Sequence, residues 1–253
     1  MEEAQADDKK PSGGSHSVRR IRRIAEHVDA RTYLEVGVAK GRTFNALTFD
    51  RKVAVDPRFR FDIADHRKAG VDFHELTSDR YFSEYGALQK FDIVFLDGLH
   101  TFQQTLRDFC NSLACAHART VWLIDDVLPI DVFSAWPVQK EAYQFRKRAG
   151  GDSAAWHGDV FKVVFFIHDF FPMFRYVTFK DQGNPQTLVW KAPQANFAPI
   201  FDSLEAIERL SYFDLLKRET VLNLQSEEDG FGLFLASLRG SHEGGAGSGV
   251  SEK

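Results

Sequence analysis

Short apolar segments alternate with amphipathic or polar segments through the first half of the chain. Apolar runs of strand length cover residues 32–36, 52–56, 72–75, 92–96 and 120–124. Between them the pattern predicts one helix from Thr43 and another from about Thr101 to about Ala116. Continuous apolar strands separated by helices indicate a parallel sheet covered on both faces. The pattern therefore predicts an α/β fold.

The alternation stops at Val127. Residues 127–158 hold two prolines, a charged stretch and a glycine pair, and they follow the carboxyl end of a predicted strand. A segment of this length inside a compact domain is usually functional or disordered. Because it follows a strand end, we predict a lid over a substrate; the alternative is an excursion without a function. FRYVTF (174–179) and QTLVWK (186–191) predict an antiparallel hairpin, and a last helix is expected at about 201–218.

Bulk composition favours one soluble domain. We place it at residues 17–237, with disordered tails at 1–16 and 238–253, where the sequence is polar or rich in glycine and serine. A net charge of −4 favours neither nucleic acid nor a membrane surface as a partner. The two cysteines, Cys110 and Cys115, form no disulfide framework, and no signal peptide is visible, so we expect a cytoplasmic protein.

The stretch YLEVGVAKGRTF (33–44) carries the first candidate binding site. Gly37 and Gly41 follow an apolar strand and allow a ligand to approach the backbone closely. A helix after the turn would direct free N–H groups at a negative group, and Asp56, which closes the next strand, can accept ribose hydroxyls. The spacing does not match the dinucleotide fingerprint. These features predict a nucleotide-type ligand other than NAD; the alternative is an ordinary strand-to-helix turn.

Acidic residues end two neighbouring predicted strands. Asp97 closes FDIVFLD, and Asp125 and Asp126 close VWLIDD. Carboxylates that converge at one edge of a sheet repel one another, which makes a hard divalent cation such as Mg²⁺ a natural occupant. The alternative is that each aspartate caps the turn or helix that follows it.

These segments resemble a known family. The pattern E-x-G-x-x-x-G (35–41) resembles the first motif of class I S-adenosylmethionine-dependent methyltransferases. LDGLHTFQQTLRDF and IDDVLP are similar to the macrocin-type sugar O-methyltransferases, which share the metal site of the catechol-type enzymes. The resemblance implies a Rossmann-like methyltransferase fold: a mostly parallel seven-stranded sheet with a C-terminal antiparallel hairpin. It also implies a helix at 160–170, despite the β-branched and aromatic residues there, for which Asp159 is a favourable N-cap.

The resemblance also implies roles for individual residues. His100 would be the general base beside the catalytic Asp97, with His157 as the reserve base, whereas His168 would be structural. The metal ligands would be Asp97, Asp125 and Asp126. The residues expected to bind S-adenosylmethionine are Glu35, Gly37, Gly41, Thr43, Asp56, Ser78 and Asp79. The sequence alone equally allows Thr77-Ser78-Asp79 to be a helix cap.

The activity implied is methyl transfer to a hydroxyl of a sugar, glycoside or other saccharide, with Mg²⁺ or another divalent cation. A catechol or other phenol is the nearest rival acceptor, and the aromatic residues of the predicted lid suit either. A hydroxylase-associated protein and a non-catalytic cofactor-binding module of the same fold are the remaining alternatives. The sequence does not determine the oligomeric state, and a homo-oligomer is one possibility.

Overall fold

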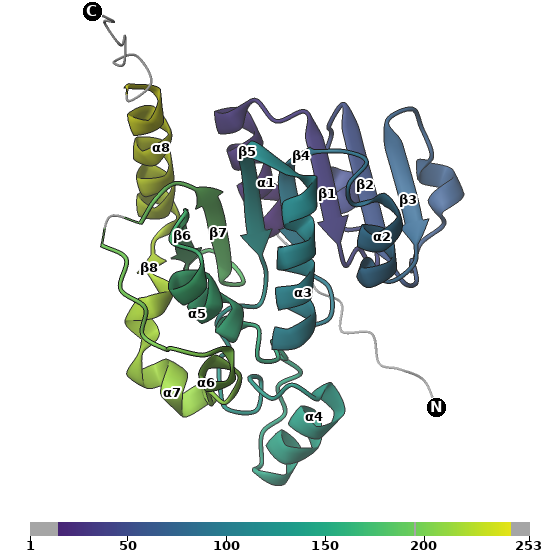
Figure 1. The fold of residues 1–253 in the computed structure, drawn as a ribbon. Helices are drawn as coiled ribbons and strands as arrows, with labels where there is room; N and C mark the ends of the chain where they lie inside the picture. The colour runs from purple at the N-terminus through teal and green to yellow at the C-terminus, as the bar shows by residue number, and fades with distance from the viewer. Residues whose placement is uncertain (1–14, 195, 244–253) are drawn as a thin grey trace, which may run out of the picture.

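The computed structural model describes residues 15–194 and 196–243, and its centre is an eight-stranded sheet (Figure 1). The strand order is β3-β2-β1-β4-β5-β7-β6-β8. The first five strands run parallel, as predicted. They are β1 (Thr32–Val36), β2 (Arg51–Asp56), β3 (Val71–Glu75), β4 (Phe91–Leu96) and β5 (Ala116–Ile124).

The predicted hairpin is confirmed and joins the same sheet. β6 (Phe174–Phe179) and β7 (Gln186–Lys191) pair antiparallel, and β7 also pairs antiparallel with β5. The expected seven strands are extended by β8 (Leu224–Gln225), which runs parallel to the end of β6. The result is the Rossmann-like methyltransferase architecture with one short extra edge strand.

Helices cover both faces of the sheet (Figure 1). On one face α2 (Ser78–Tyr85), α3 (Phe102–Ser112) and α5 (Phe161–Phe170) contribute to an apolar cluster that includes the fully buried Trp122. On the other face α1 (His16–Val28) and α8 (Glu227–Glu243) contribute Ile21, Ile24 and Phe231 to a second apolar cluster. The predicted helix at 160–170 is therefore confirmed as α5, because its apolar residues fill a core between helices and sheet.

The helix expected from Thr43 is wrong. Only η1 (Phe44–Ala46), a single 3-10 turn, follows the glycine turn. The ammonium of buried Lys52 donates to the carbonyls of Phe44 (2.6 Å) and Leu47 (2.9 Å). A continuing α-helix would need these carbonyls for its own hydrogen bonds. The tertiary contact with β2 thus replaces the helix.

The C-terminal part also differs from the prediction. The expected helix at 201–218 is two short helices, α6 (Leu204–Glu208) and α7 (Tyr212–Lys217), because Ser211 and Asp214 form a capping box that starts a new helix. The turns η2 (Ile63–His66), η3 (Leu113–Cys115) and η4 (Glu219–Leu222) were not predicted. α8 continues to Glu243, beyond the domain end expected at 237. Residues 1–14 and 244–253 of the expected tails lie outside the described residues.

The segment predicted to be a lid, residues 127–158, lies beyond the carboxyl ends of the parallel strands (Figure 1). It contains α4 (Gln139–Arg148), whose Arg146 is buried and donates to Asp131 Oδ1 at 2.9 Å. In the described part of the chain, no helix combines the length and apolar character of a membrane span.

Candidate active site

The glycine turn after β1 lies directly against the end of β4. Gly37 has φ +89°, and a Cβ added to it would lie 1.9 Å from the Asp97 carbonyl oxygen. Gly41 also has a left-handed φ, +68°, and a Cβ added to it would meet the side chains of Asn45 and Phe61. Only glycine allows this approach, so the turn and the acidic strand end are fixed relative to each other.

Asp56 closes β2 as predicted, but its carboxylate holds the glycine turn. Oδ2 accepts from the backbone N–H groups of Val38 (2.9 Å) and Ala39 (2.8 Å), and Oδ1 accepts from Arg58 N–H (2.7 Å). A carboxylate offers about four acceptor positions, so a further acceptor position remains for a ribose hydroxyl. The ribose role stays a prediction.

Glu35 lies beneath the turn and is fully buried. Its Oε2 accepts from the Tyr33 hydroxyl at 2.6 Å. Burial raises the pKa of Glu35 from 4.5 to about 8, although the Tyr33 hydrogen bond and the charge of Lys52 act in the opposite direction. Near neutral pH the folded protein therefore keeps this carboxyl largely protonated.

Replacing Glu35 with glutamine is expected to change the pH dependence of stability. Between the unfolded pKa of 4.5 and the folded value of about 8, the folded state holds a proton that the unfolded chain has lost. The free energy of unfolding of the wild type therefore falls as pH rises through this window and falls no further above it. Glutamine still accepts from Tyr33 and does not titrate. Urea unfolding at about pH 5.5 and about pH 8 should show a smaller difference in Glu35→Gln, and equal differences in both proteins would contradict the assignment.

A cavity of about 820 Å³ opens beside the glycine turn. The cavity is lined by six of the seven residues predicted to bind the cofactor: Glu35, Gly37, Thr43, Asp56, Ser78 and Asp79. The seventh, Gly41, belongs to the glycine turn but does not line the cavity. Thr77 caps α2, so the alternative of a helix cap is confirmed at that residue. Gln104 Nε2 donates to Ser78 Oγ and Asp79 Oδ1, both at 3.2 Å, which fixes the two residues at the cavity wall.

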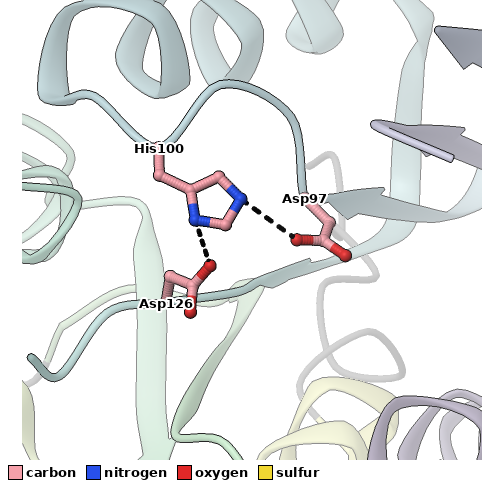
Figure 2. A group of neighbouring side chains, drawn as sticks. All are labelled: Asp97, His100 and Asp126. Carbon is pink, nitrogen blue, oxygen red and sulfur yellow. Dashed lines mark ion pairs between the residues drawn. The ribbon is translucent and has the colours of Figure 1, made fainter. Parts of the chain in front are cut away.

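Asp97, His100 and Asp126 form a group with potential metal-ligand atoms within 4.8 Å of one another (Figure 2), and Asp97 and His100 also line the cavity. Asp97 follows β4, and Asp126 follows β5. His100 Nδ1 contacts Asp126 Oδ2, and its Nε2 lies 3.8 Å from Asp97 Oδ1. Asp126 has φ +59°, which turns its side chain back toward His100. The predicted convergence of Asp97 and Asp126 at one edge is therefore confirmed.

Asp125 lies beside this group and makes different contacts. Its Oδ1 accepts from the backbone N–H of Asp126 (2.8 Å) and from the Asn184 amide nitrogen (2.6 Å). Asn184 Nδ2 also donates to Asp126 Oδ1 at 2.7 Å. Asn184 was not singled out by the sequence analysis, because an asparagine in a hairpin turn is an ordinary turn residue.

The electrostatics of the acids favour a cation. Burial, followed by the charges of Asp125 and Asp126, raises the pKa of Asp97 well above its usual value. Burial and the charge of Asp126 raise the pKa of Asp125 to about 7. Asp126 is also buried, but the hydrogen bond and charge of His100 lower its pKa. Burying several carboxylates costs free energy that a divalent ion would offset, and oxygen ligands suit Mg²⁺, so these residues fit a magnesium ion.

The histidines of the site occupy distinct environments. The His100 ring stacks on Trp156 from the predicted lid, with centroids 5.1 Å apart and planes at 8°. A Cβ added to Gly158 would lie 1.6 Å from the His100 carbonyl oxygen, so the lid segment packs against this residue. His157 is buried, and its Nε2 lies 3.9 Å from Asp126 Oδ1. In α5, His168 Nδ1 lies 2.6 Å from Asp169 Oδ1, and His168 does not line the cavity beside the glycine turn.

Comparisons with known proteins agree with this architecture. A family described as a methyltransferase domain matches residues 34–127. The structure is similar to cofactor-bound Rv0187 from MTB, with a TM-score of 0.50 and 14% identity over 74% of this chain and 84% of that one. It is also similar to an O-methyltransferase from Bacillus cereus in complex with SAH, with a TM-score of 0.48 and 16% identity over 74% and 84%. None of the curated proteins matches the sequence.

A further similarity is to the MycE methyltransferase of the mycinamycin biosynthetic pathway in complex with Mg, SAH and mycinamycin VI. The TM-score is 0.43, with 15% identity over 72% of this chain and 51% of that one. At these identities the solved structures are evidence of the fold alone, and only the similarity with a TM-score of 0.50 supports it. The family match adds that residues 34–127, less than half of the chain, are similar to a methyltransferase domain.

Proposed function

We propose that this protein is an S-adenosylmethionine- and metal-dependent O-methyltransferase whose acceptor is a hydroxyl of a sugar, glycoside or other saccharide. The observation that carries the proposal is the group of Asp97, His100 and Asp126 at the end of the cofactor-type cavity. A hydroxyl oxygen is a weak nucleophile until it loses its proton, and this group brings a base and cation ligands to one place.

Asp97 and Asp126, with Asp125 beside them, would hold the cation, and the glycine turn with Asp56 would hold S-adenosylmethionine. When bound, the cation supplies a lower pKa and a fixed position for the acceptor hydroxyl, and the cofactor supplies the methyl group. Both sets of residues line or border the same cavity, so donor and acceptor sites adjoin.

His100 is the proposed general base. Its Nδ1 contacts the Asp126 carboxylate, which orients the ring and leaves Nε2 as the proton acceptor, and Trp156 fixes the ring plane. Asp126 would also stabilise the imidazolium that forms when His100 accepts a proton. His157 stays the reserve base, because its Nε2 lies 3.9 Å from Oδ1 of the same Asp126 carboxylate.

Replacing His100 with glutamine should lower kcat by about 10²–10⁴-fold while leaving the affinity for S-adenosylmethionine unchanged. The residual rate should rise with pH, because hydroxide substitutes for the missing base. Steady-state kinetics across pH, with calorimetry for the cofactor, measure both. A kcat close to that of the wild type would place the base elsewhere, with His157→Gln as the next variant.

The direct test of the function uses the wild-type protein with S-adenosylmethionine, Mg²⁺ and a panel of sugar and phenol acceptors. Mass spectrometry should detect acceptors that gain one methyl group, and excess chelator should abolish the gain. Methylation of phenols alone would replace the saccharide by the phenol alternative. Full turnover in chelator would exclude the metal, and absence of cofactor binding would exclude the transferase function. Cofactor binding without methylation of any acceptor would favour the hydroxylase-associated or non-catalytic alternatives.

A further inference from the structure

We infer that Asn184, in the hairpin loop at residues 180–185, is a positioning residue of the metal centre. Its amide nitrogen donates to Oδ1 of both Asp125 (2.6 Å) and Asp126 (2.7 Å). One neutral donor group thus holds two consecutive carboxylates side by side. This inference rests on the proposed metal-dependent function.

The geometry shows why a donor is needed at this point. Asp126 N–H donates to Asp125 Oδ1, and the left-handed backbone at Asp126 brings both carboxylates to one side of the chain. Two adjacent carboxylates, one buried and one half-buried, repel each other and would turn apart without a shared partner. The Asn184 amide occupies the Oδ1 side of both, and Asp126 Oδ2 is left facing His100 and Asp97.

The position of Asn184 is fixed from outside the loop. The buried guanidinium of Arg20 in α1 donates to the carbonyls of Asn184 (2.6 Å) and Asp181 (2.7 Å). Arg19 donates to the Gln182 carbonyl at 3.0 Å, and the Glu227 N–H donates to Asp181 Oδ1 at 2.7 Å. A loop held by α1 and α8 presents a pre-oriented amide, which is what a positioning residue requires.

A direct-ligand role is the competing explanation, because an asparagine carbonyl oxygen also suits Mg²⁺. The two roles predict opposite results for Asn184→Asp. An aspartate lacks the amide donor and adds a third charge beside Asp125 and Asp126, so it should weaken cation binding if Asn184 acts as a donor. If residue 184 were a ligand, an added carboxylate would preserve or strengthen binding.

The test is a titration of the whole protein with Mn²⁺, in which calorimetry or electron paramagnetic resonance measures the affinity for the ion. In Asn184→Ala, the Mn²⁺ affinity should fall about 10–100-fold, and the metal concentration for half-maximal rate should rise with kcat at saturating metal largely retained. Asn184→Asp should bind Mn²⁺ at least as weakly as the alanine variant. The affinity for S-adenosylmethionine should be unchanged in both variants.

Gln182→Ala is the matched control. It removes an amide side chain from the same loop, where Gln182 is exposed and uses its backbone carbonyl to accept from Arg19. Its Mn²⁺ affinity should equal that of the wild type. Should Asn184→Ala fail to fold, Asn184→Gln moves the amide by one methylene group and should show the same loss of affinity.

Wild-type Mn²⁺ affinity in Asn184→Ala, or in Asn184→Gln where the alanine variant does not fold, would overturn the inference and leave the proposed function intact. Undiminished affinity in Asn184→Asp would overturn it in favour of a direct ligand. If the wild-type protein itself binds no Mn²⁺, the proposed metal dependence fails and the inference fails with it. The wild-type titration therefore separates the two failures.

Discussion

Asp97→Asn is expected to lower the rate of methyl transfer by roughly 10³-fold or more, because it removes a charged oxygen ligand from the site where the acceptor hydroxyl is activated. Cofactor affinity should change little, since the Asp56 carboxylate and the glycine turn that it holds are unaltered by the substitution. The same variant should be at least as stable as the wild type. Burial and the charges of Asp125 and Asp126 raise the pKa of Asp97, so its ionised form is unfavourable in the folded protein without a cation.

Single-turnover rates, calorimetry with S-adenosylmethionine and thermal unfolding would measure these three effects, and Mn²⁺ titration would measure the expected loss of cation affinity. Asp108→Asn is the matched control, because Asp108 is a buried acid that lines the same cavity but hydrogen-bonds to Gln104 instead of joining the metal group. Its Mn²⁺ affinity should match the wild type. If Asp97→Asn retained Mn²⁺ affinity and turnover, Asp97 would be no more than a structural residue at the end of β4.

The strands were predictable because both faces of the sheet are covered. Each buried strand must be apolar along its whole length, so residues such as Leu34, Val94 and Leu123 mark β1, β4 and β5 directly in the sequence. β8 has only two residues, too few to show any periodicity. The missing helix after β1 depends on Lys52, whose contact with the Phe44 carbonyl exists only in the folded sheet.

α8 was missed for a local reason. Gly230 and Gly232 lower the intrinsic helix propensity of its first turns, and the glycine-rich sequence beyond it resembles a tail. In the structure, Gly230 packs on β6, where an added Cβ would lie 2.7 Å from the Phe179 ring. Packing thus favours a residue that propensity disfavours.

Part of the candidate site could be predicted from the sequence, and part of it could not. Asp97, Asp126 and His100 follow strands, and strand ends in a parallel sheet meet at one edge, so their convergence follows from sequence order. Asn184 reaches this edge from an antiparallel hairpin, and the buried Arg20 holds its loop. Such a contact depends on the placement of α1 and α8, which no local pattern encodes.

Arg20→Ala is expected to lower the free energy of unfolding by about 3–5 kcal/mol, because it removes one of the two arginines that pair with buried Glu227 and leaves the carbonyls of Asp181 and Asn184 without their donor. The guanidinium is fully buried, and its Nε donates to Glu227 Oε2 at 3.0 Å. Urea unfolding would measure the loss. Arg23→Ala is the control on the same helix: Arg23 pairs with the exposed Glu228, and such surface pairs contribute about 0–1 kcal/mol. Equal losses in the two variants would show that Arg20 contributes no more than a surface pair.

The consequence of Arg20→Ala should extend to the metal centre. Burial alone would raise the pKa of Glu227, and Arg19 and Arg20 together hold it below its usual value. Removing Arg20 therefore loosens both the N-terminus of α8 and the loop that presents Asn184, so Mn²⁺ affinity should fall along with stability. Because a cation that binds only the folded state stabilises it by RT ln(1 + [L]/Kd), added Mn²⁺ should raise the Tm of Arg20→Ala by less than it raises that of Arg23→Ala. Equal Mn²⁺-induced shifts would show that the loop keeps Asn184 in place without Arg20, and that the stability of the hairpin and the geometry of the metal centre are independent.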